Sequence, residues 1–158
     1  MADTDGEGLA LDGAAPFLGE YRHALDEKGR LFFPSAFRPP LAEGLVITVG
    51  HDRCLAVLPQ REWAKVVSDL RHMRSTDRRE RAYVRMVTSS AQPDTLDKQG
   101  RVTIPPRLRD YAGLQRDVAI VGCDNQLELW DAPTWEAYWN EAIAEFAGTE
   151  QPFDVGGF

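Results

Sequence analysis

Leu25-Asp-Glu-Lys-Gly-Arg-Leu-Phe-Phe-Pro34 reappears 71 residues later as Leu96-Asp-Lys-Gln-Gly-Arg-Val-Thr-Ile-Pro105. Leu, Asp, Gly, Arg and Pro coincide in the two stretches, and the apolar sites between them correspond. Each stretch is centred on Asp-x-x-Gly-Arg, at Asp26–Arg30 and at Asp97–Arg101. This repetition indicates that the chain is one structural unit written twice.

The repetition continues downstream with an offset of 72 residues. Val49-Gly50 there corresponds to Val121-Gly122, and Trp63 corresponds to Trp135. The change from 71 to 72 predicts one inserted residue in the intervening loop. Chance rarely produces matches in this order, so the duplication is expected to extend through most of the chain.

Each copy predicts the same order of elements, β-β-α-β-β. A strand leads into the Asp-x-x-Gly turn, whose Asp and Gly suit a tight hairpin, and a second strand follows. Proline then ends that strand and begins a short helix. Two further strands enclose a second Gly/Asp turn. The predicted elements after the first turn are Arg30–Phe33, Pro34–Arg38, Leu45–Val49 and Cys54–Leu58 in one copy, and Arg101–Ile104, Pro105–Tyr111, Val118–Val121 and Gln126–Trp130 in the other.

Helical spacing of apolar residues predicts helices after each copy and between the copies, the latter over Arg78–Ser90. The predicted organisation is a disordered acidic tail over 1–16, repeat 1 over 17–62, linking helices over 63–92, repeat 2 over 93–132, a C-terminal helix over 133–147 and a flexible tail over 148–158.

These elements predict an α+β fold. A four-stranded unit of this size cannot bury enough apolar surface alone. Two units in one chain can pair about a pseudo-twofold axis and share the core of a small β-barrel, with the helices flanking it. A barrel of this size cannot also bury the large apolar side chains of Trp135, Trp139 and Phe146, which favours a homo-oligomer.

The charge of the chain is unevenly distributed. The formal net charge is −7, which by itself argues against binding nucleic acid. Residues 1–20 and 128–158, however, carry acids and no bases. Residues 21–127 therefore hold all 18 bases and 13 of the 25 acids. A mildly basic body with acidic ends is compatible with a phosphate-binding face.

Several functional classes find no support in the sequence. No nucleophile–base pair, phosphate loop or metal-ligand spacing is present, so we expect no enzyme, no cofactor, no metal and no small-molecule substrate. Cys54 and Cys123 are expected to be small buried hydrophobic residues. No apolar run can span a bilayer and no secretory signal is present, which favours a cytoplasmic protein without membrane contact.

A cation follows the glycine of both turns. Lys28 and Arg30 bracket the first glycine, and Lys98 and Arg101 bracket the second. The arginine fork can grip phosphate or a guanine edge with two hydrogen bonds, and lysine can meet phosphate as a point charge. A plain hairpin turn would not require these cations. For one turn alone, a hairpin with a solvated arginine explains the residues equally well, so Lys28, Arg30, Lys98 and Arg101 are at this point candidates for contacts with double-stranded DNA.

The other turn residues are predicted to shape the backbone. Asp26 and Asp97 cannot favourably face phosphate, so we expect them to hydrogen-bond the turn backbone or to orient the arginine. Gly29 and Gly100 allow a positive φ.

Longer segments of the sequence resemble the MraZ family, which belongs to the AbrB-like swapped-hairpin barrels. The resemblance implies a bacterial transcriptional regulator that binds promoter DNA upstream of the division and cell-wall gene cluster containing its own gene. With this resemblance, we predict that Lys28, Arg30, Lys98 and Arg101 bind the double-stranded DNA. It also implies that the barrels assemble into a ring and associate with the nucleoid. The segments that carry the resemblance are Phe17–Tyr21, Leu25–Arg30, Leu96–Pro106, Leu108–Ala112 and Leu129–Asp131.

The first copy departs from the family pattern. Phe32 replaces a small polar residue where the second copy keeps Thr103, and Ala36 stands where family members often have lysine. The resemblance thus implies that the first copy contacts DNA less fully. We expect Arg101→Ala to cost more DNA affinity than Arg30→Ala.

Two other functions remain open from the sequence. The turns could bind acidic protein partners within an oligomeric scaffold, or the chain could act as an antitoxin-like AbrB module. A basic cluster between the copies is interleaved with acids and is expected to form ion pairs. The cluster contains Arg71, Arg74, Arg78, Arg79, Arg81 and Arg85.

Overall fold

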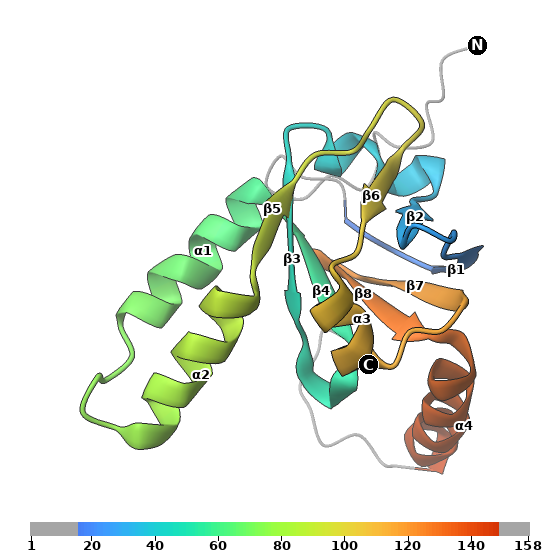
Figure 1. The fold of residues 1–158 in the computed structure, drawn as a ribbon. Helices are drawn as coiled ribbons and strands as arrows, with labels where there is room; N and C mark the ends of the chain where they lie inside the picture. Colours follow the sequence, from blue (N-terminus) through green and yellow to red (C-terminus); the bar gives the residue numbers. More distant parts are fainter. Residues whose placement is uncertain (1–15, 149–158) are drawn as a thin grey trace.

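The computed structural model of the chain describes residues 16–148. Apart from residues 16 and 148, the predicted tails at 1–16 and 148–158 lie outside the described residues. As expected, the fold is α+β. It combines an antiparallel six-stranded sheet with a two-stranded sheet and the helices α1 to α4 (Figure 1).

The order of the strands in the larger sheet is β1-β7-β8-β4-β3-β5, and β2 pairs with β6 in the smaller one. The bounds of the elements are β1 (Glu20–Ala24), β2 (Arg30–Phe32), β3 (Leu45–Val49), β4 (Leu55–Pro59), α1 (Gln60–Arg71), α2 (Arg78–Ser90), β5 (Gln92–Asp94), β6 (Arg101–Thr103), α3 (Pro106–Ala112), β7 (Asp117–Cys123), β8 (Gln126–Asp131) and α4 (Ala132–Gly148).

The two copies exchange their first strands. The sequence predicts a hairpin across each Asp-x-x-Gly turn, but the strands beside the turns form their ladders with the other copy. β1 pairs with β7 and β5 pairs with β3, while β2 pairs with β6. The strands on either side of the turns have only three to five residues. A separate hairpin of such short strands would bury too little apolar surface to be stable, and pairing with the other copy supplies that surface.

The strand register corrects the alignment of the two copies. Ile47 faces Gln92 and Ile120 faces Tyr21 in equivalent ladders. Ile47 and Ile120 are therefore equivalent at an offset of 73, not the expected 72, and both are fully buried in one core. An offset of 72 would match Ile47 with Ala119, which packs on the opposite face. A shift of one residue exchanges the two faces of a strand, so burial decides the register.

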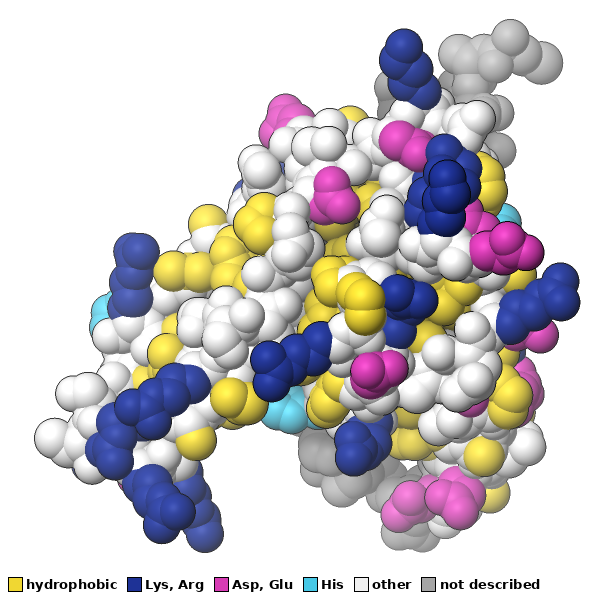
Figure 2. Space-filling view, in the orientation of Figure 1, with side chains coloured by type: hydrophobic (Ala, Val, Ile, Leu, Met, Phe, Trp, Pro, Cys, Tyr) yellow, Lys and Arg dark blue, Asp and Glu magenta, His cyan; other side chains and the backbone are white. Residues whose placement is uncertain are grey.

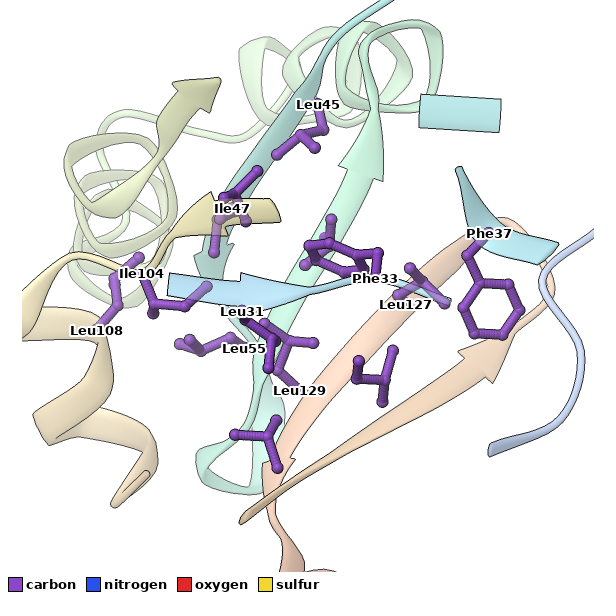
Figure 3. Close-up of a cluster of buried hydrophobic side chains, with 14 of the residues drawn as sticks. Leu31, Phe33, Phe37, Leu45, Ile47, Leu55, Ile104, Leu108, Leu127 and Leu129 are labelled. Atoms are coloured by element: carbon purple, nitrogen blue, oxygen red, sulfur yellow. The ribbon is translucent and has the colours of Figure 1, made fainter. Parts of the chain in front are cut away.

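Both copies contribute to the main core (Figure 3). Leu31 of β2 and Phe33, which follows this strand, lie in one apolar cluster with Val102 and Ile104 from the second copy. All four side chains are at most 3% exposed. A second, smaller cluster lies on the other face of the sheet, where Trp130 packs against Trp135 near the start of α4.

The short helix after β2 differs from the prediction. The sequence predicts a helix over Pro34–Arg38, but the structure has two 3₁₀ turns, Ser35–Phe37 and Pro39–Leu41. Consecutive prolines at 39 and 40 lack amide donors and disfavour a continuous α-helix. The second copy lacks these prolines and forms α3, which ends at Gly113 with φ +62°.

Helix α2 spans Arg78–Ser90, as predicted. The Asp77 carboxylate caps it by accepting hydrogen bonds from the amides of Arg79 and Glu80 at 2.8 and 3.1 Å. None of the helices between residues 16 and 148 is long and apolar enough to cross a membrane.

The two cysteines differ in burial. Cys54 is fully buried, as expected, whereas Cys123 is only partly buried. Burial raises the pKa of the Cys123 thiol to about 12, and the nearby Glu128 acts in the same direction. The thiol therefore stays protonated at neutral pH.

Candidate nucleic-acid interface

The first Asp-x-x-Gly-Arg turn is held by one carboxylate. Asp26 Oδ1 accepts hydrogen bonds from the amides of Lys28 and Arg30, both at 2.9 Å. Asp26 Oδ2 accepts a third from Arg30 Nε at 2.6 Å. One carboxylate thus closes the turn and orients the arginine. This ion pair uses only Nε–H, and the two terminal guanidinium nitrogens have no part in it.

The second turn repeats this geometry. Asp97 Oδ1 accepts from the amides of Gln99 and Arg101 at 2.9 Å, and Oδ2 accepts from Arg101 Nε at 2.7 Å. The hydrogen bond from the Arg101 side chain lowers the pKa of Asp97 to about 2, with the Arg101 amide acting in the same direction. In the first turn, the Arg30 amide and then its side chain lower the pKa of Asp26.

The lowered pKa of Asp97 predicts a pH-dependent stability. Its ordinary value is 3.8, so ionised Asp97 stabilises the folded state above about pH 4 and loses this effect as the pH falls to about 2. We expect wild type to melt at a higher temperature than Asp97→Asn above pH 4, and the difference to shrink as the pH falls to 2. Thermal unfolding of both proteins from pH 2 to pH 6 measures it. A difference independent of pH would contradict the ionic role.

Each turn is covered by an arginine from the other copy. The guanidinium of Arg109 lies over Gly29, where an added Cβ would be 2.8 Å from Cζ. Arg38 lies over Gly100 in the same way, and an added Cβ there would overlap its Nε. The two glycines have φ of +74° and +81°. They are therefore needed both for the backbone conformation and for the close approach of the arginines.

Each of these arginines donates to a backbone carbonyl of its own copy, and backbone hydrogen bonds then join the two copies. Arg38 Nε donates to the Phe33 carbonyl at 2.8 Å, and the Phe33 amide donates to the Gly100 carbonyl at 2.9 Å. The equivalent bonds in the other direction join Arg109 to Ile104 and Ile104 to Gly29. The two turns therefore form one unit built from both copies.

Sequence reasoning missed Arg38 and Arg109, although a signal for them was present. They are 71 residues apart, the same spacing as Arg30 and Arg101. Each follows the proline that ends its turn segment by four residues. Extending the comparison of the copies into the short helices would have revealed them.

The β2–β6 ribbon carries Arg30 and Arg101 on its outer face. Arg30 is opposite Thr103, and Phe32 is opposite Arg101. Leu31 and Val102 alternate with these residues and face the core. Arg30 and Arg101 are thus diagonal neighbours, which in antiparallel strands lie roughly 7–8 Å apart.

Phe32 affects the arginine of the other copy. The Arg101 guanidinium carbon lies 5.5 Å from the centre of the Phe32 ring, within range of a cation–π contact. Phe32 of the first copy therefore contacts the arginine of the second copy, Arg101. The side chain of Arg101 is 20% exposed and that of Arg30 is 31% exposed.

The two lysines lie at the turns but not at equivalent positions. Lys28 is two residues after Asp26, whereas Lys98 directly follows Asp97. Both are exposed. Figure 2 shows Lys and Arg side chains gathered over the β2–β6 region and, separately, near the α1–α2 connection.

Local contacts occupy part of the basic cluster of Arg71–Arg85. The Arg74 amide donates to Glu80 at 2.9 Å, and Arg74 Nε lies 3.9 Å from the same carboxylate oxygen. Arg81 donates to the Ser75 carbonyl at 2.9 Å. The Arg74–Glu80 pair agrees with the expected ion pairing.

Comparison with known proteins identifies the family. The family model described as "MraZ protein, putative antitoxin-like" matches the chain twice, over residues 17–86 and 88–155. The "Transcriptional regulator MraZ" of Kineococcus radiotolerans is 47% identical over 131 residues, covering 83% of this chain and 92% of the relative. The protein of the same name from Leifsonia xyli subsp. xyli is 44% identical over 142 residues, covering 90% of this chain and 99% of the relative. This chain therefore belongs to the MraZ family.

Proposed function

We propose that the protein is a non-catalytic transcriptional regulator that binds double-stranded promoter DNA through the outer face of the β2–β6 ribbon. One observation carries the proposal: two arginines, each held by its own aspartate, lie side by side on a two-stranded antiparallel ribbon. The DNA major groove admits such a ribbon, and arginine is the commonest reader of guanine there. The names of the relatives support a role in transcription.

Within this proposal, Arg30 and Arg101 contact base edges or phosphates with their terminal guanidinium nitrogens. Because an aspartate already orients each side chain, little conformational freedom is lost on binding. Lys28 and Lys98 add phosphate contacts at the turns. Asp26, Asp97, Gly29 and Gly100 maintain the shape of the turns.

The finer architecture is also part of the proposal. The reciprocal pairing of β1 with β7, β5 with β3 and β2 with β6 supports an AbrB-like swapped-hairpin barrel with a pseudo-twofold axis. The tandem family matches support its division into two repeats with linking helices and a C-terminal helix. We propose that several such barrels assemble into a ring that acts in the cytoplasm at the nucleoid, on its own division and cell-wall operon.

A ring of barrels predicts a preference for tandem sites. One barrel presents few cations and binds weakly, whereas linked barrels raise the effective concentration for each further site. We expect an array of short promoter repeats to bind about 10²- to 10⁴-fold more tightly than one isolated repeat. Gel shifts with fragments of the protein's own upstream region measure this ratio. Equal affinity for one repeat and for the array would refute the tandem mechanism.

The same gel shifts at graded salt distinguish DNA binding from a protein scaffold. Phosphate contacts release counterions, so affinity for the promoter is expected to fall steeply as salt rises. Failure to bind any promoter fragment, even at low salt, would favour the scaffold.

A further inference from the structure

The apolar stripe of helix α4 continues beyond the surface on which the helix packs. At its start, Ala132 and Trp135 are buried, and Trp135 Nε1 donates to Glu20 at 2.8 Å. The stripe continues through Trp139, Ile143 and Phe146, which are 44%, 39% and 70% exposed. Their i, i+4, i+7 spacing is that of a helix that inserts anchors into a groove.

A groove of matching character lies beside helix α2. It has a volume of about 390 Å³ and lies between α2, the loop after β3 and Tyr111 of α3. Tyr83 and Met86 of α2 are exposed along it, and the His51 ring stacks on Tyr83 with centroids 5.8 Å apart. Aromatic rings beside a flexible methionine suit a bulky apolar side chain.

The charges of the two helices decide which surfaces can meet. Helix α4 carries three glutamates, of which Glu136 pairs with Arg22, and no basic residue, whereas α2 carries four arginines and one glutamate. Pairing α4 with α4, or α2 with α2, brings like charges together. Pairing α4 with α2 brings opposite charges together around the apolar contact.

The positions of the helices exclude a contact within one barrel. Helix α2 packs beside β3, and α4 packs beside β7 and β8, on opposite sides of the molecule (Figure 1). Figure 2 shows hydrophobic and His side chains at the surface between α2 and α3. A second copy is thus the occupant that the charges and the spacing fit.

We infer that α4 of one copy inserts Trp139, Ile143 and Phe146 into the α2–Tyr111 groove of the next copy. The contact joins two different surfaces, so it runs head to tail and closes into a ring when the rotation between neighbours permits. These two surfaces would form the interface of the proposed ring, on which this inference rests.

Two variants of the full chain test the inference. The double variant Trp139→Lys/Phe146→Lys replaces two apolar anchors of α4 with charged side chains. The double variant Arg79→Glu/Met86→Glu places two negative charges in the groove, where they repel the glutamates of α4. All four side chains are exposed, and circular dichroism verifies that both variants fold. Sedimentation velocity is expected to show an oligomer for wild type, a monomer for each variant alone, and a 1:1 heterodimer of twice the monomer mass in their mixture.

The outcomes separate the inference from the proposed function. A heterodimer forms because the mixture contains one intact helix and one intact groove. A folded variant that still assembles alone, or a mixture that stays monomeric, would overturn the pairing of these surfaces. A monomeric wild type would overturn the ring itself. Binding of each variant to one isolated DNA repeat is expected to match that of wild type, since the β2–β6 ribbon is unchanged.

Discussion

Replacing both Arg30 and Arg101 by alanine is expected to lower the affinity for promoter DNA by about 10²- to 10⁴-fold. A bidentate arginine–guanine pair contributes about 1–3 kcal/mol, and about 1.4 kcal/mol corresponds to a tenfold change in affinity. The loss includes repulsion of phosphate by Asp26 and Asp97, whose carboxylates lose their arginine partners in this variant. Fluorescence anisotropy with a labelled promoter fragment measures the change.

A charge-matched control distinguishes these contacts from the net charge of the protein. Lys65→Ala/Arg71→Ala also removes two positive charges, but from helix α1, which is not part of the β2–β6 ribbon. We expect this control to reduce affinity less than threefold. Equal losses in the two double variants would show that the arginines of the ribbon have no special role.

The single substitutions test the asymmetry between the copies. We expect Arg101→Ala to cost more affinity than Arg30→Ala, because the Phe32 ring holds the Arg101 guanidinium in place before DNA binds. Phe32→Ala should reduce the difference between the two. Equal losses for the two single variants would refute the asymmetry.

The second large effect is expected in the shared core. Phe33 is fully buried against residues of both copies, and Phe33→Ala is expected to lower the free energy of unfolding by about 3–5 kcal/mol. Domains of ordinary stability have about 5–15 kcal/mol in total. Urea unfolding followed by circular dichroism measures the loss.

The neighbouring residue supplies the matched control. Phe32→Ala makes the same chemical change one position earlier, on the opposite face of the strand. Phe32 is 37% exposed, so we expect it to lose less than about 1 kcal/mol. Similar losses for the two variants would contradict the assignment of Phe33 to the core and Phe32 to the surface.

Elements whose ends are decided by neighbouring residues, such as helix α2, were predicted well from the sequence. Helix α2 begins and ends at the expected residues, with Asp77 as its cap. The short helix expected over Pro34–Arg38 forms as a 3₁₀ turn over Ser35–Phe37, because the prolines that follow it lack the amide donors of a continuous α-helix. The offset of 72 was wrong for β3, because matching residue types do not report which face of a strand is buried.

The candidate site was only partly visible in the sequence. The repeated turns drew attention to Arg30 and Arg101, and we retain both as proposed DNA contacts. Arg38 and Arg109, which cover the turn glycines, were not singled out. Their positions depend on the exchange of strands between copies, which no local pattern reports.

The sequence by itself determined the duplication and the identity of both turns. Asp, Gly and Pro act on backbone within a few residues of themselves, so their effect can be read from their order. The tertiary structure alone decided that each turn is completed by the other copy, and that Phe32 lies over Arg101. These contacts join segments about 70 residues apart, and they form because neither copy can bury its apolar face alone.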